Sequence, residues 1–205
     1  MNRAAFLDRD GVINRKAPTP DQYITRWEEI QILPGAVEAI ALLNQAGFRV
    51  IVVTNQRCVA HGLITVAELE RLHKRLCDSL AGAGAIIDAV YFCPHELQPP
   101  CNCRKPQPGM LLEAARTHEI DLTVSWMIGD SNKDIEAGRN AGCKTAQLLS
   151  ENETGNDNAD VVAQSLLEAT DQILRLEKNS ADRRAMGTTQ SHYGDSSTAR
   201  GNCGR

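Results

Sequence analysis

The chain has 205 residues, with 22 Lys and Arg against 26 Asp and Glu, so its net charge is −4 and its pI is about 5.7. Hydrophobic residues make up 42%, enough for one domain to bury a core without disulfides. The acidic balance and only 4% aromatic residues give a nucleic-acid partner no support. The apolar run 48–54 is far shorter than the roughly 20 residues of a membrane helix, and the N-terminus lacks a signal region, so we expect a cytoplasmic protein without membrane contact.

Short apolar strands and helical patterns alternate along the chain. Strands are predicted over residues 4–7, 48–54, 86–92, 124–129 and 144–149. Helices are predicted after Pro34-Gly35, after a capping box at Thr65 and Glu68, and over 109–119, 134–141 and 163–176. This alternation is typical of right-handed βαβ units, so we expect an α/β fold with a doubly wound parallel sheet.

The chain divides into one domain and a tail. Residues 1–178 carry all the predicted strands and helices and form one α/β domain. Residues 179–205 have few apolar side chains and are rich in Gly, Ser and Thr, which predicts a disordered tail.

Polar side chains follow several predicted strands where those strands end. Asp8 and Asp10 follow the first strand, Thr54 ends the second, Asp130 follows 124–129, and Lys105 lies in a Pro-rich loop. Taken singly, such an aspartate is commonly a helix cap or turn former, and such a lysine a surface charge. In open α/β sheets, however, ligands bind at the carboxyl ends of the strands, so we expect these five side chains to converge.

This set of side chains suits phosphoryl transfer. Clustered carboxylates need a cation, and oxygen ligands favour Mg²⁺, which binds a few carboxylates together with a substrate phosphate. A carboxylate beside a metal and a lysine can attack phosphorus, and a hydroxyl can donate to the phosphoryl oxygens. A second carboxyl two residues further on can protonate the leaving oxygen and then activate water.

Four segments, FLDRDGVIN, VVTNQ, CRKPQPGM and IGDSNKDIEAG, resemble the motifs of the haloacid dehalogenase (HAD) superfamily of phosphatases. The resemblance implies a Rossmann-like HAD fold, with Asp8 as nucleophile and Asp10 as general acid and base. It also implies that Thr54 binds the phosphoryl group and that Lys105 offsets its charge. Magnesium would be held by Asp8, Asp130 and Asp10, the last through its backbone carbonyl.

Asp134 closes the fourth motif, and its role stays open at this point. Its carboxylate could hold Lys105, join the metal shell or cap the following helix. The five residues with implied catalytic or metal-binding roles are all present, namely Asp8, Asp10, Thr54, Lys105 and Asp130. Their presence favours an enzyme over a non-catalytic phosphate-binding protein. A nucleic-acid end-processing phosphatase is a further alternative within the superfamily, but the composition provides no basic or stacking surface for it.

Cysteines cluster once in the chain. The seven cysteines are an odd number, which argues against a disulfide framework. Cys93, His95, Cys101 and Cys103 form C-x-H-x5-C-x-C, a pattern that suits a closed, tetrahedral, structural Zn²⁺ site. The alternative is a set of reduced thiols without a metal. Zinc over loop 93–103 would fix the position of Lys105, because Arg104 and Lys105 directly follow the last ligand, Cys103.

The zinc loop is similar to that of two phosphatase families within the superfamily. D-glycero-D-manno-heptose 1,7-bisphosphate 7-phosphatases match most motifs, and histidinol-phosphate phosphatases share CPH and CxCRKP with a short spacing like this one. Both act on small phosphate esters, and the small zinc-loop members are expected to be monomers. Three positions depart from the family pattern: Arg57 replaces a small residue, His61 replaces an arginine, and Ser131 stands where a lysine often follows the motif-four aspartate, with Lys133 nearby.

Substrate recognition is expected from short loops. No insertion reaches the roughly 50 residues of a small domain, so the cap is minimal. Arginine suits bidentate binding of phosphate. Four residues are assigned to substrate binding, namely Asn55, Gln56, Arg57 and Arg104, and Arg15, Lys16 and His61 are further candidates for a second phosphate.

Overall fold

The computed structural model describes residues 2–19, 22–149 and 158–189. Six parallel strands form one sheet in the order β3-β2-β1-β4-β5-β6. The strands are β1 (Arg3–Leu7), β2 (Phe48–Asn55), β3 (Ala89–Cys93), β4 (Trp126–Gly129), β5 (Lys144–Leu148) and β6 (Val161–Ala163). The helices are α1 (Ala36–Gln45), α2 (Val66–Gly82), α3 (Gly109–His118), α4 (Asn132–Ala141) and α5 (Leu166–Thr189), with 3-10 turns η1 (Trp27–Glu29) and η2 (Leu122–Val124).

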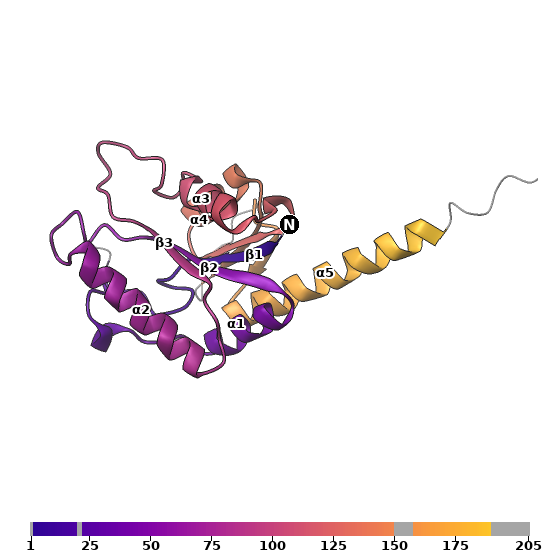
Figure 1. Ribbon diagram of the computed structural model, residues 1–205, viewed down its shortest axis with the longest axis horizontal. Coiled ribbons are helices and arrows are strands. Elements are labelled where there is room, and N and C mark those ends of the chain that lie inside the picture. The colour runs from indigo at the N-terminus through magenta and orange to yellow at the C-terminus, as the bar shows by residue number, and fades with distance from the viewer. Residues whose placement is uncertain (1, 20–21, 150–157, 190–205) are drawn as a thin grey trace, which may run out of the picture.

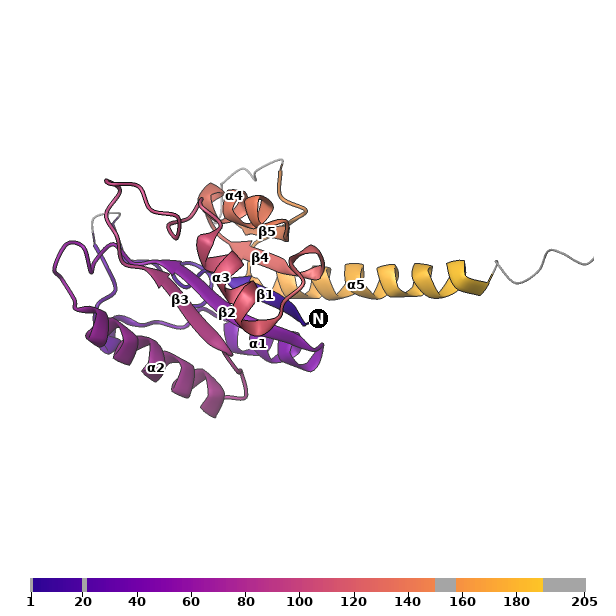
Figure 2. The same ribbon diagram turned by 45° about the horizontal axis from the view of Figure 1, so that its top comes forward.

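Helices cover both faces of this sheet (Figure 2). Successive side chains of a strand point to opposite faces, so Ala5 and Leu7 of β1 pack under α1, α2 and α5. Ala4 and Phe6 pack on the other side, against α3 and α4. The continuous apolar run of β2 has the same cause, because a central parallel strand is buried on both faces. The predicted doubly wound α/β fold is confirmed.

The carboxyl end of the chain differs from the prediction. The helix expected from residue 163 begins at Leu166, because Ala163 belongs to β6, a three-residue strand too short to show a period in the sequence. The helix then continues to Thr189, so residues 179–189 are helical where a disordered tail was expected. A scarcity of apolar residues removes packing partners but not helix propensity, and no proline interrupts this stretch. Figure 1 shows this half of α5 projecting from the sheet. Residues 190–205 lie outside the described part.

The connections at the carboxyl edge of the sheet contain little regular secondary structure. The segment from β2 to α2, residues 56–65, contains no further helix or strand, and the described part of the β1–α1 connection contains only η1. The expected minimal cap therefore matches these loops. Among the described residues, no helix combines the length and the apolar character needed to cross a membrane.

Candidate active site

The register of the sheet places the motif residues side by side. Asp8 follows β1, Thr54 lies near the end of β2, and Asp130 follows β4, which is the other neighbour of β1. Their side chains line one cavity of about 550 Å³. The same cavity is lined by Asp10, Lys105 and Asp134, and by Lys16, Tyr23, Arg104 and Lys133. The predicted convergence of the strand-end side chains is therefore present.

Lys105 lies at the floor of this cavity, only 3% exposed. Its Nζ is 2.9 Å from Oδ1 of Asp8 and 2.6 Å from Oδ1 of Asp134, and it donates to the carbonyl of Val53 at 2.7 Å. Burial by itself would lower the pKa of Lys105, but the charges of Asp134 and Asp8 outweigh it and raise the pKa. The lysine is therefore a fixed positive charge beside Asp8.

Asp134 combines two of its three possible roles. Its Oδ1 pairs with Lys105, while its Oδ2 accepts from the backbone N–H of Ser131 at 3.0 Å and from the Ser131 hydroxyl at 2.6 Å. These bonds make a capping box at the start of α4. One carboxylate therefore fixes both the helix that follows β4 and the buried lysine.

The carboxylates beside Lys105 leave negative charge that a cation would balance. Oxygens of Asp8, Asp130 and Asp134 lie within 4.8 Å of one another. Burial raises the pKa of Asp8 to about 7, and the charge of Lys105 only partly opposes this. Burial also raises the pKa of Asp130 to about 6, although Lys16 Nζ lies 2.6 Å from its Oδ2. Clustered hard oxygen ligands of this kind fit Mg²⁺.

Gly11 makes room for this cluster. Its φ is +94°, and a Cβ at this position would lie 1.7 Å from Oδ2 of Asp130 and 2.6 Å from Cε of Lys16. Any side chain at residue 11 would displace the Asp130 carboxylate, in addition to the strain of that backbone conformation.

The carboxylate of Asp10 is not grouped with those of Asp8, Asp130 and Asp134. It accepts from Arg9, from Asn14 Nδ2 at 2.8 Å and from Gln56 Nε2 at 2.9 Å. Burial would raise the pKa of Asp10, but the Arg9 charge and these hydrogen bonds outweigh it and lower the pKa. The side chain is therefore not grouped with Asp8 and Asp130, which leaves only the backbone carbonyl of Asp10 for the expected metal contact.

The residues assigned to substrate binding fall into different places. Both amide groups are engaged within the protein: Asn55 bonds to the backbone of Lys105, and Gln56 Nε2 bridges Asp10 and Thr54 Oγ1 at 2.9 Å. Asn55, Gln56 and Arg104 all line the cavity, and Arg104 donates to the carbonyl of His95 at 3.4 Å.

Arg57 lies outside the lining of the cavity. Its Nε donates to the Tyr23 hydroxyl at 3.0 Å, and its Nη1 is 3.5 Å from Glu96, which also lies 2.8 Å from Nε2 of His61. Tyr23 lines the cavity and was missed, because a single tyrosine in a loop carries no pattern. Arg15 lines neighbouring cavities instead.

The cysteine cluster forms a compact group beside the site. The ligand atoms of Cys93, His95, Cys101 and Cys103 lie within 4.8 Å of one another, with His95 Nδ1 3.2 Å from Cys103 Sγ and Cys101 Sγ 3.6 Å from Cys93 Sγ. Such separations suit the edges of a tetrahedron around an ion bound at roughly 2.3 Å from sulfur. Because Cys93 ends β3 opposite Asn55 of β2, the register places this cluster next to the loop of Lys105.

Known proteins resemble the chain throughout this region. A family model described as "HAD-hyrolase-like" matches residues 102–169. D-glycero-beta-D-manno-heptose-1,7-bisphosphate 7-phosphatase of Rhodopseudomonas palustris is 44% identical over 146 residues, which are 68% of this chain and 79% of that protein. The Pseudomonas aeruginosa enzyme of the same name is 43% identical over 145 residues, 70% of this chain and 80% of that protein.

The fold has a solved counterpart. The crystal structure of D,D-heptose 1,7-bisphosphate phosphatase from B. bronchiseptica, complexed with magnesium and phosphate, matches with a TM-score of 0.76 and 33% sequence identity. The match covers 85% of this chain and 99% of that one. The chain therefore belongs to the HAD-like phosphatases, which are phosphoric monoester hydrolases, and within them to the family of D-glycero-D-manno-heptose 1,7-bisphosphate 7-phosphatases.

Proposed function

We propose that the protein removes the 7-phosphate of D-glycero-D-manno-heptose 1,7-bisphosphate through an aspartyl-phosphate formed on Asp8. The observation that carries the proposal is the contact between Asp8 Oδ1 and the buried Lys105 Nζ at 2.9 Å, in a cavity that Asp130 and Thr54 also line. The names of the relatives, one of them solved with magnesium and phosphate, support the substrate.

The roles of the side chains follow from their places. Asp8 attacks the phosphorus, while the Lys105 ammonium and the Thr54 hydroxyl offset the charge on the phosphoryl oxygens. The contacts of Asp10 favour its ionised form, so it must take up a proton before it can give one to the leaving sugar oxygen. It then takes a proton from the water that cleaves the aspartyl-phosphate. Arg104, at the side of the cavity, binds the remainder of the substrate.

Two metals complete the proposal. Asp8, Asp130 and the backbone carbonyl of Asp10 would hold Mg²⁺, which supplies charge that lets the carboxylate and the phosphate approach. Cys93, His95, Cys101 and Cys103 would hold a structural Zn²⁺ that stiffens the loop leading to Lys105. A cytoplasmic location and a monomeric state stay predictions.

Histidinol-phosphate phosphatase activity is the second candidate. The short spacing of five residues between His95 and Cys101 favours it, since that family often carries such a loop. Both candidates use the same catalytic side chains, so only the substrate separates them.

Phosphate release in the presence of Mg²⁺ tests the proposal. We expect rapid release from one anomer of heptose 1,7-bisphosphate, little from histidinol phosphate, and none with Asp8→Asn. Faster release from histidinol phosphate would move the protein to the second candidate. Substantial turnover by folded Asp8→Asn would contradict the nucleophile, whichever substrate is used.

A further inference from the structure

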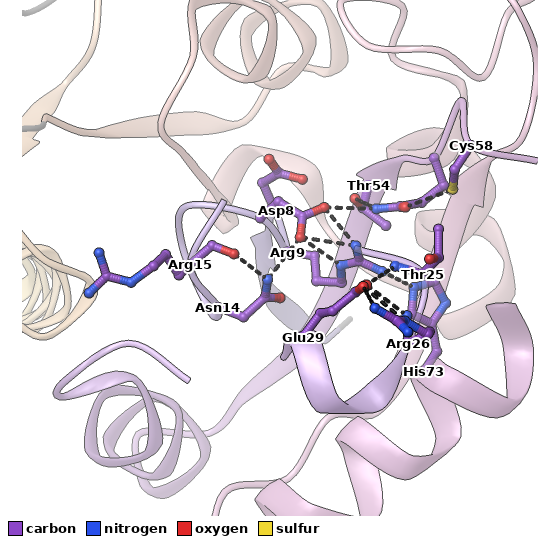
Figure 3. A network of polar contacts seen from close by, with 12 residues as sticks. Asp8, Arg9, Asn14, Arg15, Thr25, Arg26, Glu29, Thr54, Cys58 and His73 are labelled. Carbon is purple, nitrogen blue, oxygen red and sulfur yellow. Dashed lines mark hydrogen bonds and ion pairs between the residues drawn. The ribbon is translucent and has the colours of Figure 1, made fainter. Parts of the chain in front are cut away.

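Two buried polar side chains, Arg9 and His73, form a chain of contacts that ends at Asp10. Arg9 is fully buried, and its Nη2 donates to Oδ2 of Asp10 at 2.8 Å and to Oδ1 at 2.9 Å, while Nε donates to Oδ1 at 3.1 Å. The other terminal nitrogen, Nη1, lies 3.0 Å from Nε2 of His73. His73 comes from α2, 64 residues further along the chain, and Figure 3 shows its ring pointing at Arg9.

The contact defines the protonation of His73. A guanidinium can only donate, so Nε2 of His73 must accept and the ring proton must lie on Nδ1. In the described part of the chain this buried Nδ1 has no hydrogen-bond partner. Burial, helped by the Arg9 charge, lowers the pKa of His73 to about 3, so the ring stays neutral and remains an acceptor. The ring is only 4% exposed and packs edge-on against Phe92 at 5.5 Å.

Among the described residues, the His73 ring therefore has Arg9 as its single hydrogen-bond partner. A buried guanidinium needs acceptors for its N–H groups, because unpaired groups in an apolar interior are costly. Asp10 accepts from Nε and Nη2, and His73 is the acceptor recorded for Nη1 among the residues described. Without His73, the planar guanidinium of Arg9 would rotate toward another acceptor. The Asp10 carboxylate, which accepts from Arg9 on both oxygens, would rotate with it.

We propose that His73 is a positioning residue, which acts through the Arg9 guanidinium to hold the carboxyl of Asp10 in the orientation needed for proton transfer to the leaving oxygen. The inference rests on the proposed function, in which Asp10 is the general acid and base. It assigns a role to a residue of α2, outside the four motifs.

Two substrates with different leaving groups test this role. A sugar alkoxide needs a proton as it leaves, whereas the nitrophenolate of p-nitrophenyl phosphate leaves with little help. Because kcat/KM covers only the steps up to the first irreversible one, it reports leaving-group departure from each substrate. The ratio of the two kcat/KM values is also independent of how much of a variant is folded.

We expect His73→Leu to lower kcat/KM for heptose 1,7-bisphosphate by about 10- to 100-fold, the effect of a misplacement near 1 Å, and that for p-nitrophenyl phosphate far less. His73→Gln, whose carbonyl oxygen can reach Arg9, should restore the ratio of the two values, and the shorter His73→Asn should not. If His73→Leu does not fold, the comparison of His73→Gln with His73→Asn tests the positioning role by itself. Leu80→Ala, a buried change on the same helix, should leave the ratio unaltered.

A double variant shows whether His73 acts through Arg9. In an Arg9→Met background, His73→Leu should change the ratio no further, since coupled residues are not additive. Equal effects of His73→Leu in both backgrounds, or equal losses for both substrates, would overturn the inference. Asp10→Asn distinguishes failure of this inference from failure of the proposed function. If Asp10→Asn leaves the ratio of the two kcat/KM values unchanged, Asp10 is not the acid and the proposed mechanism fails. If Asp10→Asn alters the ratio and His73→Leu does not, the inference alone fails.

Discussion

The side chain of Asn55 clamps the backbone of Lys105 on both sides. Its Oδ1 accepts from the Lys105 N–H at 3.1 Å, and its Nδ2 donates to the Lys105 carbonyl at 3.1 Å. Asn55 ends β2, the strand on which Thr54 also lies. These two hydrogen bonds fix the position of Lys105, which lies in a loop 50 residues further along the chain, relative to β2 in the central part of the sheet.

Removing this clamp should reduce both turnover and stability. We expect Asn55→Ala to lower kcat by about tenfold or more through misplacement of Lys105. The free energy of unfolding should fall by about 2 kcal/mol, for two hydrogen bonds. Steady-state kinetics and chemical denaturation measure the two effects. Asn140→Ala is the control, since exposed Asn140 donates to the neighbouring Pro106 carbonyl at 3.2 Å and should leave kcat unchanged. Wild-type kcat in Asn55→Ala would show that the clamp is dispensable.

The buried ion pairs of Lys105 should be important for folding in magnesium-free buffer. Lys105→Met leaves the carboxylates of Asp8 and Asp134 buried without their cation, which should cost about 3 kcal/mol of unfolding free energy. Lys74→Met removes an exposed pair of similar length, 2.7 Å to Asp78, and should cost at most about 0.5 kcal/mol. Denaturant titration compares them. Equal losses in the two variants would contradict the burial argument.

Zinc removal should lower stability and turnover together, because the ion would organise the loop that leads to Lys105. Metal analysis should find about one zinc per chain, lost in Cys101→Ser and after chelation. Cys77→Ser is the matched control, as Cys77 is also half-buried but lies on α2, away from the cluster. A metal-free protein with full thermal stability and full turnover would show that the four side chains are reduced thiols.

Glu177 should make the docking of α5 sensitive to acid. Burial acts to raise its pKa, but contacts with Lys144 Nζ at 2.7 Å and Trp126 Nε1 at 3.1 Å, and the charge of Arg3, lower it overall. The folded state therefore binds the proton less readily than the unfolded state. The stabilisation is complete above the ordinary glutamate pKa of about 4.3 and is lost as the pH falls through the lower folded value.

Glu177→Gln tests this pH dependence. Its free energy of unfolding should fall less steeply below about pH 4.3 than that of the unmodified protein. Glu113→Gln, an exposed change on α3, should follow the unmodified curve. If the unfolding free energies of the unmodified protein, Glu177→Gln and Glu113→Gln fall in parallel with pH, Glu177 contributes nothing to acid sensitivity.

Much of the site could be predicted from the sequence, because it depends on strand ends and on short motifs that are visible in the sequence. The strand–helix alternation places Asp8, Thr54 and Asp130 at the same edge of a parallel sheet, whichever side chains surround them. The cysteine pattern likewise lies within one loop, 93–103, so its closeness needs no knowledge of the fold. These features follow from period and spacing, and the family resemblance added the expected roles.

Other features needed the tertiary structure, because they depend on which distant groups meet. The sequence could not show that the side-chain amide of Asn55 bonds to Lys105 and that of Gln56 to Asp10. Nor could it show that Arg57 contacts Tyr23 and Glu96 and does not line the cavity. It left the role of Asp134 open, and only the structure shows that Lys105 and Ser131 contact its two oxygens. Composition determined which side chains could bind or donate, whereas the packing of α2 and the loops onto the sheet edge selected their partners.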